Sequence, residues 1–237
     1  MQLQNSIAII TGASKGLGAE ISDLLVQEGA KVYGIARGRE NLEKLQVQLG
    51  SNFIPVPLDI SDRQAVNNWV SDAFDTKTPQ ILINNAGIGA FARIDEMDAE
   101  LWDQMLKVNL SGVYNITAPI VSKMRTDNKL SYIINIGSIL GVTTRSEGAA
   151  YSATKYGIQG FSESLMKELR GDRIKVTCLN PGSIETDFFE NSGIQYHANM
   201  LQPKALAETI IFLLKTPDNF LIDELRIRPL DSRNPNK

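Results

Sequence analysis

Three residues in the second half of the chain have the types and spacing of an acid–base site. Tyr151 and Lys155 lie four residues apart in a helical pattern, so their side chains share one helix face, and Ser138 precedes them. A phenol titrates near pH ~10 in water, so it exchanges a proton at neutral pH only if a nearby cation favours its anion. Lys155 could be that cation, and Ser138 could hold a substrate oxygen. The alternative is a packed ring, a solvated lysine and a serine that opens a turn.

These residues need strands and helices to position them. Short β-branched runs alternate with stretches of helical periodicity along the chain. The predicted strands span 6–11, 31–36, 53–58, 80–84, 131–137, 174–179 and 221–228, and the predicted helices span 17–28, 41–49, 63–74, 99–124, 151–170 and 203–214. Seven strands separated by helices predict an α/β fold with a parallel sheet covered on both faces. Ser138 would lie at a strand's carboxyl end, where such sheets bind ligands.

Size and composition narrow the class of protein. The 237 residues are 43% hydrophobic and 22% charged, which suits one globular domain, and we expect it to span residues 1–230 with a flexible tail at 231–237. No segment is apolar enough to cross a bilayer. The first residues carry neither a basic region nor a small-residue cleavage site, so we expect a cytoplasmic protein.

Charge and rare residues exclude several functions. A net charge of -3 leaves no electrostatic footprint for nucleic acid, and no basic amphipathic helix suggests a membrane surface. The single histidine, His197, argues against a Ser-His-Asp triad and against histidine-rich metal sites. The single cysteine, Cys178, lies in a buried-strand pattern and is expected in the core. We therefore expect a small-molecule partner and no metal.

A glycine-rich turn follows the first predicted strand and opens the first helix. Residues 11–18 read Thr-Gly-Ala-Ser-Lys-Gly-Leu-Gly, with glycines at 12, 16 and 18. Glycines let the backbone approach a pyrophosphate, whose charge is stabilised by free N–H groups and the helix dipole. The spacing differs from the common Gly-x-Gly-x-x-Gly pattern, and a turn without a ligand is the alternative.

The end of the second predicted strand indicates which dinucleotide would bind. A carboxylate there accepts hydrogen bonds from the adenosine ribose, whereas a cation suits a 2′-phosphate. No acid appears before Glu40, while Arg37 is present and Lys15 in the glycine turn could add a second charge. This favours NADP over NAD. Arg37 and Arg39 as solvated loop residues are the alternative.

Three more strand ends carry polar or turn residues. They are Asp59, Asn84-Asn85-Ala86-Gly87, and the run from Pro181 to Thr186, and each could also be an ordinary turn. Asn109 lies among apolar residues of the predicted helix 99–124, so it either faces outward or has hydrogen-bond partners.

Together these motifs resemble the single-domain short-chain dehydrogenase/reductase family, over roughly residues 6–229. The matching features, in order, are the Thr-Gly-x-x-x-Gly-x-Gly turn at 11–18, Asn-Asn-Ala-Gly at 84–87, Asn109, Ser138, Tyr151, Lys155 and Pro181-Gly182. The resemblance implies a Rossmann-type, three-layer fold with a seven-stranded sheet, a nicotinamide cofactor, and a catalytic set of Asn109, Ser138, Tyr151 and Lys155. The expected cofactor-binding residues are Gly12, Ser14, Lys15, Gly16, Leu17, Gly18, Arg37, Asp59, Ile60, Asn85, Ala86, Gly87, Tyr151, Lys155, Pro181, Gly182, Ile184 and Thr186.

The implied activity is NADP(H)-dependent reduction of an aldehyde or ketone to an alcohol, or the reverse. Tyr151 would donate the proton beside Ser138, and Lys155 would lower the tyrosine pKa and bind the nicotinamide ribose. Asn109 would hold a water that links Lys155 to solvent. Asp59 would contact the adenine, Asn85 to Gly87 the adenosine half, and Ile184 with Thr186 the carboxamide.

Substrate identity is less defined by the sequence. Residues 187–202, with Phe188, Phe189, Ile194, Tyr196 and Met200, could cover the substrate or pack on the core, together with Ile139 and Leu140. Arg145 could meet an anionic substrate or be a solvated loop residue.

The end of the chain bears on the kind of carbonyl substrate. Family members that reduce carrier-protein-linked 3-oxoacyl groups usually end in a glycine-rich segment. Residues 223–229 read Asp-Glu-Leu-Arg-Ile-Arg-Pro and resemble instead the ends of reductases for small aldehydes, ketones and hydroxy acids. A 3-oxoacyl reductase is kept as the alternative, and a non-catalytic NADP-binding sensor as an alternative of another class.

The predicted helix 99–124 suggests self-association. Its apolar residues spread over much of its circumference, and they include Trp102, Val113, Tyr114 and Val121. The family commonly forms dimers or tetramers through this helix and the one that starts at Tyr151, so we expect a homodimer or homotetramer.

Overall fold

The structure is a computed structural model of the chain, and it describes residues 1–186, 188, 197–231 and 233. Residues 187 and 189–196 of the expected substrate cover, and 232 and 234–237 of the expected tail, lie outside this description. The strands are β1 (Ile7–Thr11), β2 (Lys31–Ala36), β3 (Phe53–Pro57), β4 (Ile81–Asn84), β5 (Ser131–Ile136), β6 (Ile174–Pro181) and β7 (Glu224–Ile227). The α-helices are α1 (Gly16–Gln27), α2 (Arg39–Leu49), α3 (Arg63–Ala73), α4 (Ala99–Leu106), α5 (Val113–Asp127), α6 (Ala149–Leu169) and α7 (Pro203–Lys215).

The seven strands form one parallel sheet in the order β3-β2-β1-β4-β5-β6-β7. The predicted doubly wound, Rossmann-type fold is confirmed. The strand order extends from β1 to β3 on one side and from β4 to β7 on the other, so the direction of winding reverses between β1 and β4. Open α/β sheets bind their ligands outside the carboxyl ends of the strands at this reversal.

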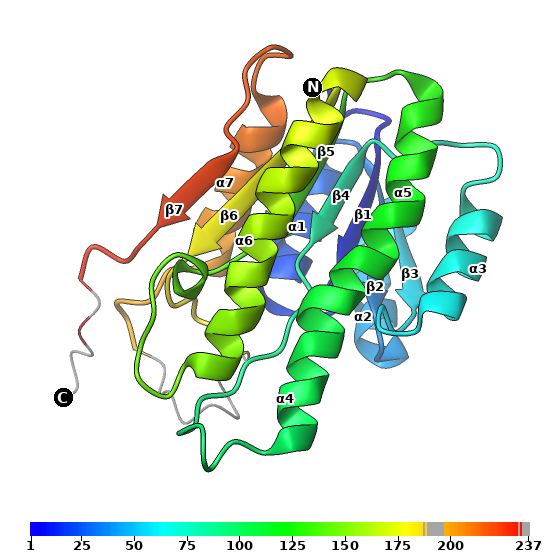
Figure 1. The fold of residues 1–237 in the computed structure, drawn as a ribbon. Helices are drawn as coiled ribbons and strands as arrows, with labels where there is room; N and C mark the ends of the chain where they lie inside the picture. The colour runs from blue at the N-terminus through cyan, green and yellow to red at the C-terminus, as the bar shows by residue number, and fades with distance from the viewer. Residues whose placement is uncertain (187, 189–196, 232, 234–237) are drawn as a thin grey trace.

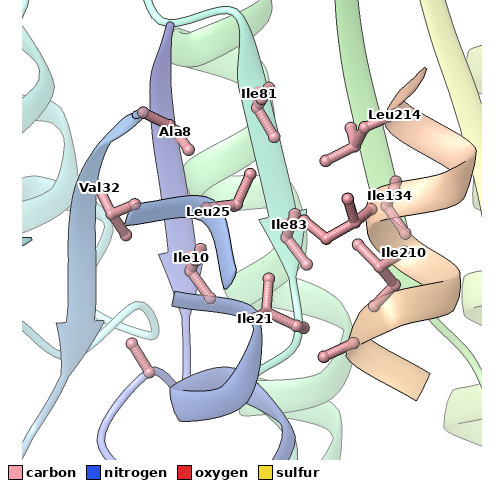
Figure 2. Packing of buried hydrophobic residues seen from close by; sticks show 14 of the residues in the cluster. Ala8, Ile10, Ile21, Leu25, Val32, Ile81, Ile83, Ile134, Ile210 and Leu214 are labelled. Atoms are coloured by element: carbon pink, nitrogen blue, oxygen red, sulfur yellow. The ribbon is translucent and has the colours of Figure 1, made fainter. Parts of the chain in front are cut away.

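Helices cover both faces of the sheet, as Figure 1 shows. Successive strand residues point to opposite faces, and both faces are apolar, which explains the continuous hydrophobic runs in the sequence. Ile10 of β1 packs with Ile21 of α1 and Ile210 of α7 on one face, as seen in Figure 2. On the other face, Ile9 packs in a cluster with residues of α3, α5 and α6, such as Ile116. Each fully buried isoleucine contributes about 1.5–3 kcal/mol of hydrophobic stabilisation.

The run predicted as one helix over 99–124 is helical throughout and extends to Asp127, but a π-helical segment divides it into α4 and α5. α4 ends at Leu106, a π-helical segment spans Lys107–Gly112, and α5 then runs through Pro119 to Asp127. A π-turn accommodates one extra residue, so it changes which side chains face the sheet without altering the apolar composition. Gly112 allows close packing here, because a Cβ at this position would lie 2.9 Å from the Ile60 side chain.

Two strand boundaries also differ from expectation. β6 continues to Pro181, two residues past the predicted end, because β7 pairs with it as far as Pro181 and Ile227. β7 begins at Glu224, three residues later than predicted. Cys178 is buried in β6, as expected. No helix in the described ranges is both long and apolar enough to cross a membrane.

Candidate active site

A pocket of about 890 Å³ opens at the carboxyl ends of the strands. It is lined by segments that follow β1 to β6, and these segments carry most of the residues selected from the sequence. All the expected cofactor-binding residues except Gly18 line it, and so do Ser138, Tyr151 and Lys155. Asn109 does not line it. The fold therefore brings motifs from distant parts of the chain to one cavity.

The glycine turn after β1 packs tightly against the segment after β4. Gly12 has a φ of 68°, in the left-handed region that favours glycine. A Cβ on Gly12 would lie 2.9 Å from the backbone of Ala86, and a Cβ on Gly18 would overlap the Gly12 carbonyl oxygen. Gly18 thus packs against the turn on the side away from the pocket, which explains why it is not a lining residue.

The beginning of α1 fits a bound phosphate group. α3 and α4 each begin with an aspartate whose side chain accepts a hydrogen bond from a first-turn N–H. α1 instead begins after Lys15, and in the described structure it has no side-chain cap and no acidic residue in its first turn. A helix start with free N–H groups and a neighbouring cation favours an anion.

Of the two arginines that follow β2, Arg37 lines the pocket and Arg39 does not. Arg37 lines the cavity, whereas Arg39 forms an ion pair with Glu43 in α2 at 3.5 Å. Glu40, the nearest acid in the sequence, pairs with Lys44 at 2.6 Å. The cofactor end of the pocket therefore has Lys15 and Arg37 but no carboxylate from the segment after β2.

The segments after β3 and β4 are held by their own hydrogen bonds. The Asp59 carboxylate accepts a bond from the Ser61 N–H at 2.8 Å, and Ile60 is buried beside it. The Thr11 hydroxyl accepts bonds from the N–H groups of Asn85 and Ala86, each at 3.0 Å. Asn84 is buried in the sheet instead, where it donates to Asn135 at 2.8 Å. These contacts fix the backbone that lines the pocket.

The segment after β6 closes another side of the pocket. Pro181, Gly182, Ile184 and Thr186 all line it. Ile184 pairs with Leu201 in an isolated parallel bridge, and the Thr186 N–H donates to the Ile184 carbonyl at 2.9 Å. Of the apolar residues named for the expected substrate cover, Phe188, Met200, Ile139 and Leu140 can be placed, and Ile139 and Leu140 line the pocket. Phe188 lines the pocket, whereas Met200 is buried.

Tyr151 and Lys155 lie in the first two turns of α6, which begins at Ala149, two residues earlier than predicted. The Lys155 ammonium lies 5.7 Å from the centroid of the Tyr151 ring and donates to the Ile136 carbonyl at 2.8 Å. Ser138 follows β5, and its hydroxyl is a hydrogen-bond partner of the Tyr151 phenol. The three residues form one cluster in which the phenol can exchange a proton.

Burial controls the protonation of both groups. It raises the pKa of Tyr151, and the hydrogen bond from Ser138 opposes this effect. Burial also lowers the pKa of Lys155 to about 8. In the chain alone the tyrosine is therefore held in its neutral form, which suits a proton donor. The expected lowering of its pKa by Lys155 stays a prediction.

Asn109 is buried in the π-helical segment and fully engaged as a donor. Its amide nitrogen donates to the Ile88 carbonyl at 2.8 Å and to the Thr154 hydroxyl at 3.1 Å. Its oxygen accepts from the Ile88 N–H at 2.9 Å. An asparagine oxygen has a second lone pair, so it retains one position for a water. Asn109 links the segment after β4 to α6 behind the pocket wall.

The comparisons with known proteins agree with this geometry. The family model described as short chain dehydrogenase matches residues 6–196, which is most of the chain. This chain belongs to the short-chain dehydrogenase family. Dehydrogenase/reductase SDR family member 11 of Bos taurus is 33% identical over 249 aligned residues, which cover 96% of this chain and 97% of that protein.

Two solved short-chain dehydrogenase structures cover nearly the whole chain. The closed form of serine dehydrogenase complexed with NADP+ is 27% identical, covers 93% of both chains and has a TM-score of 0.85. A 3-ketoacyl-(acyl-carrier-protein) reductase from Brucella melitensis, complexed with NADH, is 28% identical, covers 98% of this chain and 100% of its own, and has a TM-score of 0.88. The two neighbours bind different nicotinamide cofactors, so the family alone does not decide between them.

One residue of this short-chain dehydrogenase site was missed in the sequence. Asn180 is fully buried in β6, and its oxygen accepts a bond from the Ser138 N–H at 3.1 Å. Its nitrogen donates to Gln159 of α6 at 2.7 Å and to Glu224 of β7 at 3.4 Å. The available signal was its position directly before Pro181, one of the expected cofactor-binding residues.

Phe91, which forms an aromatic wall with Phe188 beside Tyr151, was also missed. The Phe91 ring packs on the Tyr151 ring with centroids 5.5 Å apart, and the Phe188 ring lies 5.8 Å from Tyr151. Ala90, Met105 and Ala150 belong to the same buried cluster, and Ala90 also lines the pocket. Phe91 lies in a segment without regular secondary structure, so no periodicity pointed to it.

Proposed function

We propose that this short-chain dehydrogenase interconverts a small carbonyl compound and the corresponding alcohol, with NADP(H) as cofactor. The observation that carries the proposal is the buried Tyr151 phenol, which is hydrogen-bonded to Ser138 and close to Lys155 on the wall of a pocket that a glycine-rich turn also lines. Residues 1–230 act as one dinucleotide-binding and catalytic domain.

The chain's own residues handle the proton. Bound NADPH supplies the hydride. Tyr151 donates its proton to the carbonyl oxygen, on which negative charge develops, and the Ser138 hydroxyl donates a second hydrogen bond to that oxygen. The Lys155 ammonium stabilises the phenolate that remains and then passes it a proton. Asn109 holds a water through which Lys155 recovers that proton from solvent.

The cofactor preference follows from the ends of the first two strands. Lys15 and Arg37 both line the pocket, and a guanidinium forms charge-assisted hydrogen bonds to a 2′-phosphate. The glycine turn and the beginning of α1 would hold the diphosphate. Asp59 would contact the adenine, with Ile60 beside it, and Ile184 with Thr186 would hold the carboxamide.

A second candidate is reduction of 3-oxoacyl groups on a carrier protein. The similarity to the Brucella melitensis reductase over 98% of this chain favours it. The residues at the end of β7 favour a small substrate, because they lack the glycine-rich segment that the resemblance associates with carrier-linked substrates. Non-catalytic NADP binding would have no need of Ser138, Tyr151 and Lys155 as a cluster.

We also propose a homodimer or homotetramer. Val113, Ile116, Ile120 and Met124 of α5 are buried within the chain, whereas Met105 is the one buried residue of α4, so part of the apolar surface of these helices stays accessible. Tyr114 of α5 and Tyr156 of α6 are about half exposed, at 50% and 45%. These are the two helices through which the family commonly associates.

The deciding experiment is NADPH oxidation with a panel of aldehydes, ketones and 3-oxoacyl thioesters, repeated with NADH. We expect turnover of small carbonyl compounds, and Tyr151→Phe should lower kcat by at least about a thousandfold, because it removes the donated proton. Fluorescence titration should show nearly unchanged NADPH binding in this variant. A near-native rate for Tyr151→Phe would refute its role, and tight NADPH binding without any turnover would favour the sensor.

A further inference from the structure

Next to Tyr151, the pocket combines an aromatic ring with a cation. The Phe91 ring contacts the Tyr151 ring, and the guanidinium carbon of Arg145 lies 4.9 Å from the centroid of the same Phe91 ring. Arg145 and Phe91 both line the pocket. The cation is therefore one aromatic ring away from the phenol that is proposed to donate the proton.

Arg145 is held in place without being neutralised. Its Nε donates to the Ser146 carbonyl at 3.1 Å, and its stem packs against Gly148, where a Cβ would lie 2.9 Å from the Arg145 Cγ. Contact with the Phe91 ring adds a cation–π attraction. No carboxylate of the described residues pairs with it. A guanidinium has five N–H donors, so several stay available to a ligand.

The other charges of the pocket make this end attractive to an anion. Among the described residues, Asp59 is the one carboxylate that lines the cavity, and it belongs to the segment after β3 at the adenosine end. Lys155 adds a positive charge beside Tyr151. A carboxylate next to Arg145 would thus meet cations and no described acid. Arginine forms two parallel hydrogen bonds with a carboxylate, which fixes its orientation.

We propose that Arg145 recognises a carboxylate on the substrate, and that the preferred substrates are carbonyl compounds with an apolar or aromatic body between the carbonyl and the carboxylate. The body packs against Phe91 and Leu140, the carbonyl oxygen meets Ser138 and Tyr151, and the carboxylate meets Arg145. This inference rests on the proposed function and adds a substrate class to it.

Two matched aldehydes test the proposal. 4-Carboxybenzaldehyde and its methyl ester have the same ring and carbonyl, and they differ in the negative charge. We expect the wild type to prefer the acid, and Arg145→Gln to lower the acid-to-ester ratio of kcat/KM about tenfold, mainly through KM, since a charge-assisted hydrogen bond is lost. Arg145→Lys should keep part of the preference. Added salt should weaken it in the wild type, because screening reduces the attraction at an exposed cation.

Two control variants separate Arg145 from general charge effects. Arg125→Gln removes the same charge from α5. Arg125 does not line the pocket and forms an ion pair with Asp172 at 2.8 Å, so this variant should keep the wild-type ratio. Arg228→Gln removes another arginine of the pocket lining, one that follows β7 beside Gly182. If Arg228→Gln lowers the ratio and Arg145→Gln does not, the assignment to Arg145 is wrong.

A binding measurement makes the test independent of turnover. 4-(Hydroxymethyl)benzoate and its methyl ester are titrated into the NADPH-loaded protein by calorimetry, where neither can react. If the wild type binds the acid more tightly than the ester and Arg145→Gln loses this preference, the carboxylate site is supported. That holds even if no aldehyde is reduced, because the lack of turnover would refute only the proposed function. Equal binding of acid and ester by the wild type, or an acid preference that survives in Arg145→Gln, overturns the carboxylate proposal and leaves the reductase function standing if the aldehydes are turned over.

Discussion

The Lys155 ammonium group is buried in the wall of the pocket, and its one described hydrogen-bond acceptor is the Ile136 carbonyl. Burial lowers its pKa to about 8, so its charge is lost within reach of physiological pH. The positive charge is present below that pH and absent above it. Because this charge stabilises the phenolate formed on Tyr151, the proposed mechanism makes carbonyl reduction depend on it.

We therefore predict that kcat/KM for carbonyl reduction is level below pH about 8 and falls above it. The measurement is NADPH oxidation with a neutral ketone, across pH ~6 to ~10. In Lys155→Arg the fall should disappear, since a guanidinium stays charged throughout this range, although the absolute rate will be lower. A wild-type profile that stays level past pH ~9 would contradict the role of the lysine charge.

Asn180 acts on the site through Ser138. Its side chain is fully buried, and the bond to the Ser138 N–H orients the serine that contacts the phenol. We predict that Asn180→Ala lowers kcat about tenfold or more while the dissociation constant of NADPH stays near the wild-type value, because a buried N–H left without a partner costs about 1–3 kcal/mol and lets the serine shift.

Asn135→Ala provides the control for Asn180. Asn135 is also fully buried and lies opposite Cys178 in the adjacent strand, but its hydrogen-bond partners are Asn84, at 2.8 Å, and Ser162, at 2.9 Å, rather than Ser138. Both variants should lower the melting temperature, whereas only Asn180→Ala should lower kcat in assays well below it. Equal kcat in the two variants would mean that Asn180 is purely structural.

Ser138, Tyr151 and Lys155 could be selected from the sequence because they are close to one another in the chain and carry reactive groups. Tyr151 and Lys155 share a helix, and Ser138 follows a clear strand. Asn180 could not be selected from the sequence, because its hydrogen-bond partners Ser138, Gln159 and Glu224 come from three separate parts of the chain. Its role depends on how β6 sits between β5 and β7, and local pattern does not contain that information.

At the scale of elements, the glycine turn between β1 and α1 is tightly packed by residues distant in sequence. A Cβ on Gly18 would lie 2.7 Å from the side-chain amide nitrogen of Asn85, and it would also overlap the carbonyl oxygen of Gly12. We predict that Gly18→Ala destabilises the protein by about 2 kcal/mol or more and weakens NADPH binding, because the turn must open to admit the methyl group.

Thermal unfolding and fluorescence titration with NADPH measure the two effects of Gly18→Ala. Gly160→Ala is the matched substitution, since Gly160 is an exposed position within α6 with nothing within 4 Å of an added Cβ. That variant should gain a few tenths of a kcal/mol, up to about 1 kcal/mol, from helix propensity. A stable Gly18→Ala variant with normal NADPH affinity would show that the turn is not tightly constrained.

Most elements were predictable because buried parallel strands leave apolar runs and helices leave a 3.6-residue period. The π-helical segment Lys107–Gly112 was not, because one extra residue shifts the period without removing an apolar side chain. That shift has a structural consequence. It brings Asn109 under the segment after β4, where its amide bonds both the N–H and the carbonyl of Ile88.

At the scale of the whole molecule, charge is unevenly distributed. The chain has a net charge of -3, yet Lys15 and Arg37 stand at the cofactor end of the pocket. We predict that the wild type prefers NADPH to NADH, and that Arg37→Gln lowers the NADPH-to-NADH ratio of kcat/KM about tenfold, because a charge-assisted bond to the 2′-phosphate is lost. The ratio should also fall with added salt.

Arg39→Gln is the control for the cofactor preference. Arg39 is a close neighbour of Arg37 and equally charged, but it is paired with Glu43 and does not line the pocket. Its variant should keep the wild-type ratio. A clear preference of the wild type for NADH over NADPH would contradict the proposal that NADP(H) is the cofactor.

The strand order has a consequence for how the chain acquires its structure. β1 is the first strand to be synthesised, and it needs β2 on one edge and β4, which begins at Ile81, on the other. Non-local parallel pairing of this kind is slow to form, and an unpaired apolar strand edge promotes aggregation meanwhile. Until the ribosome has released β4, the strand that will carry the glycine turn keeps one edge uncovered. Refolding yield should thus depend strongly on protein concentration.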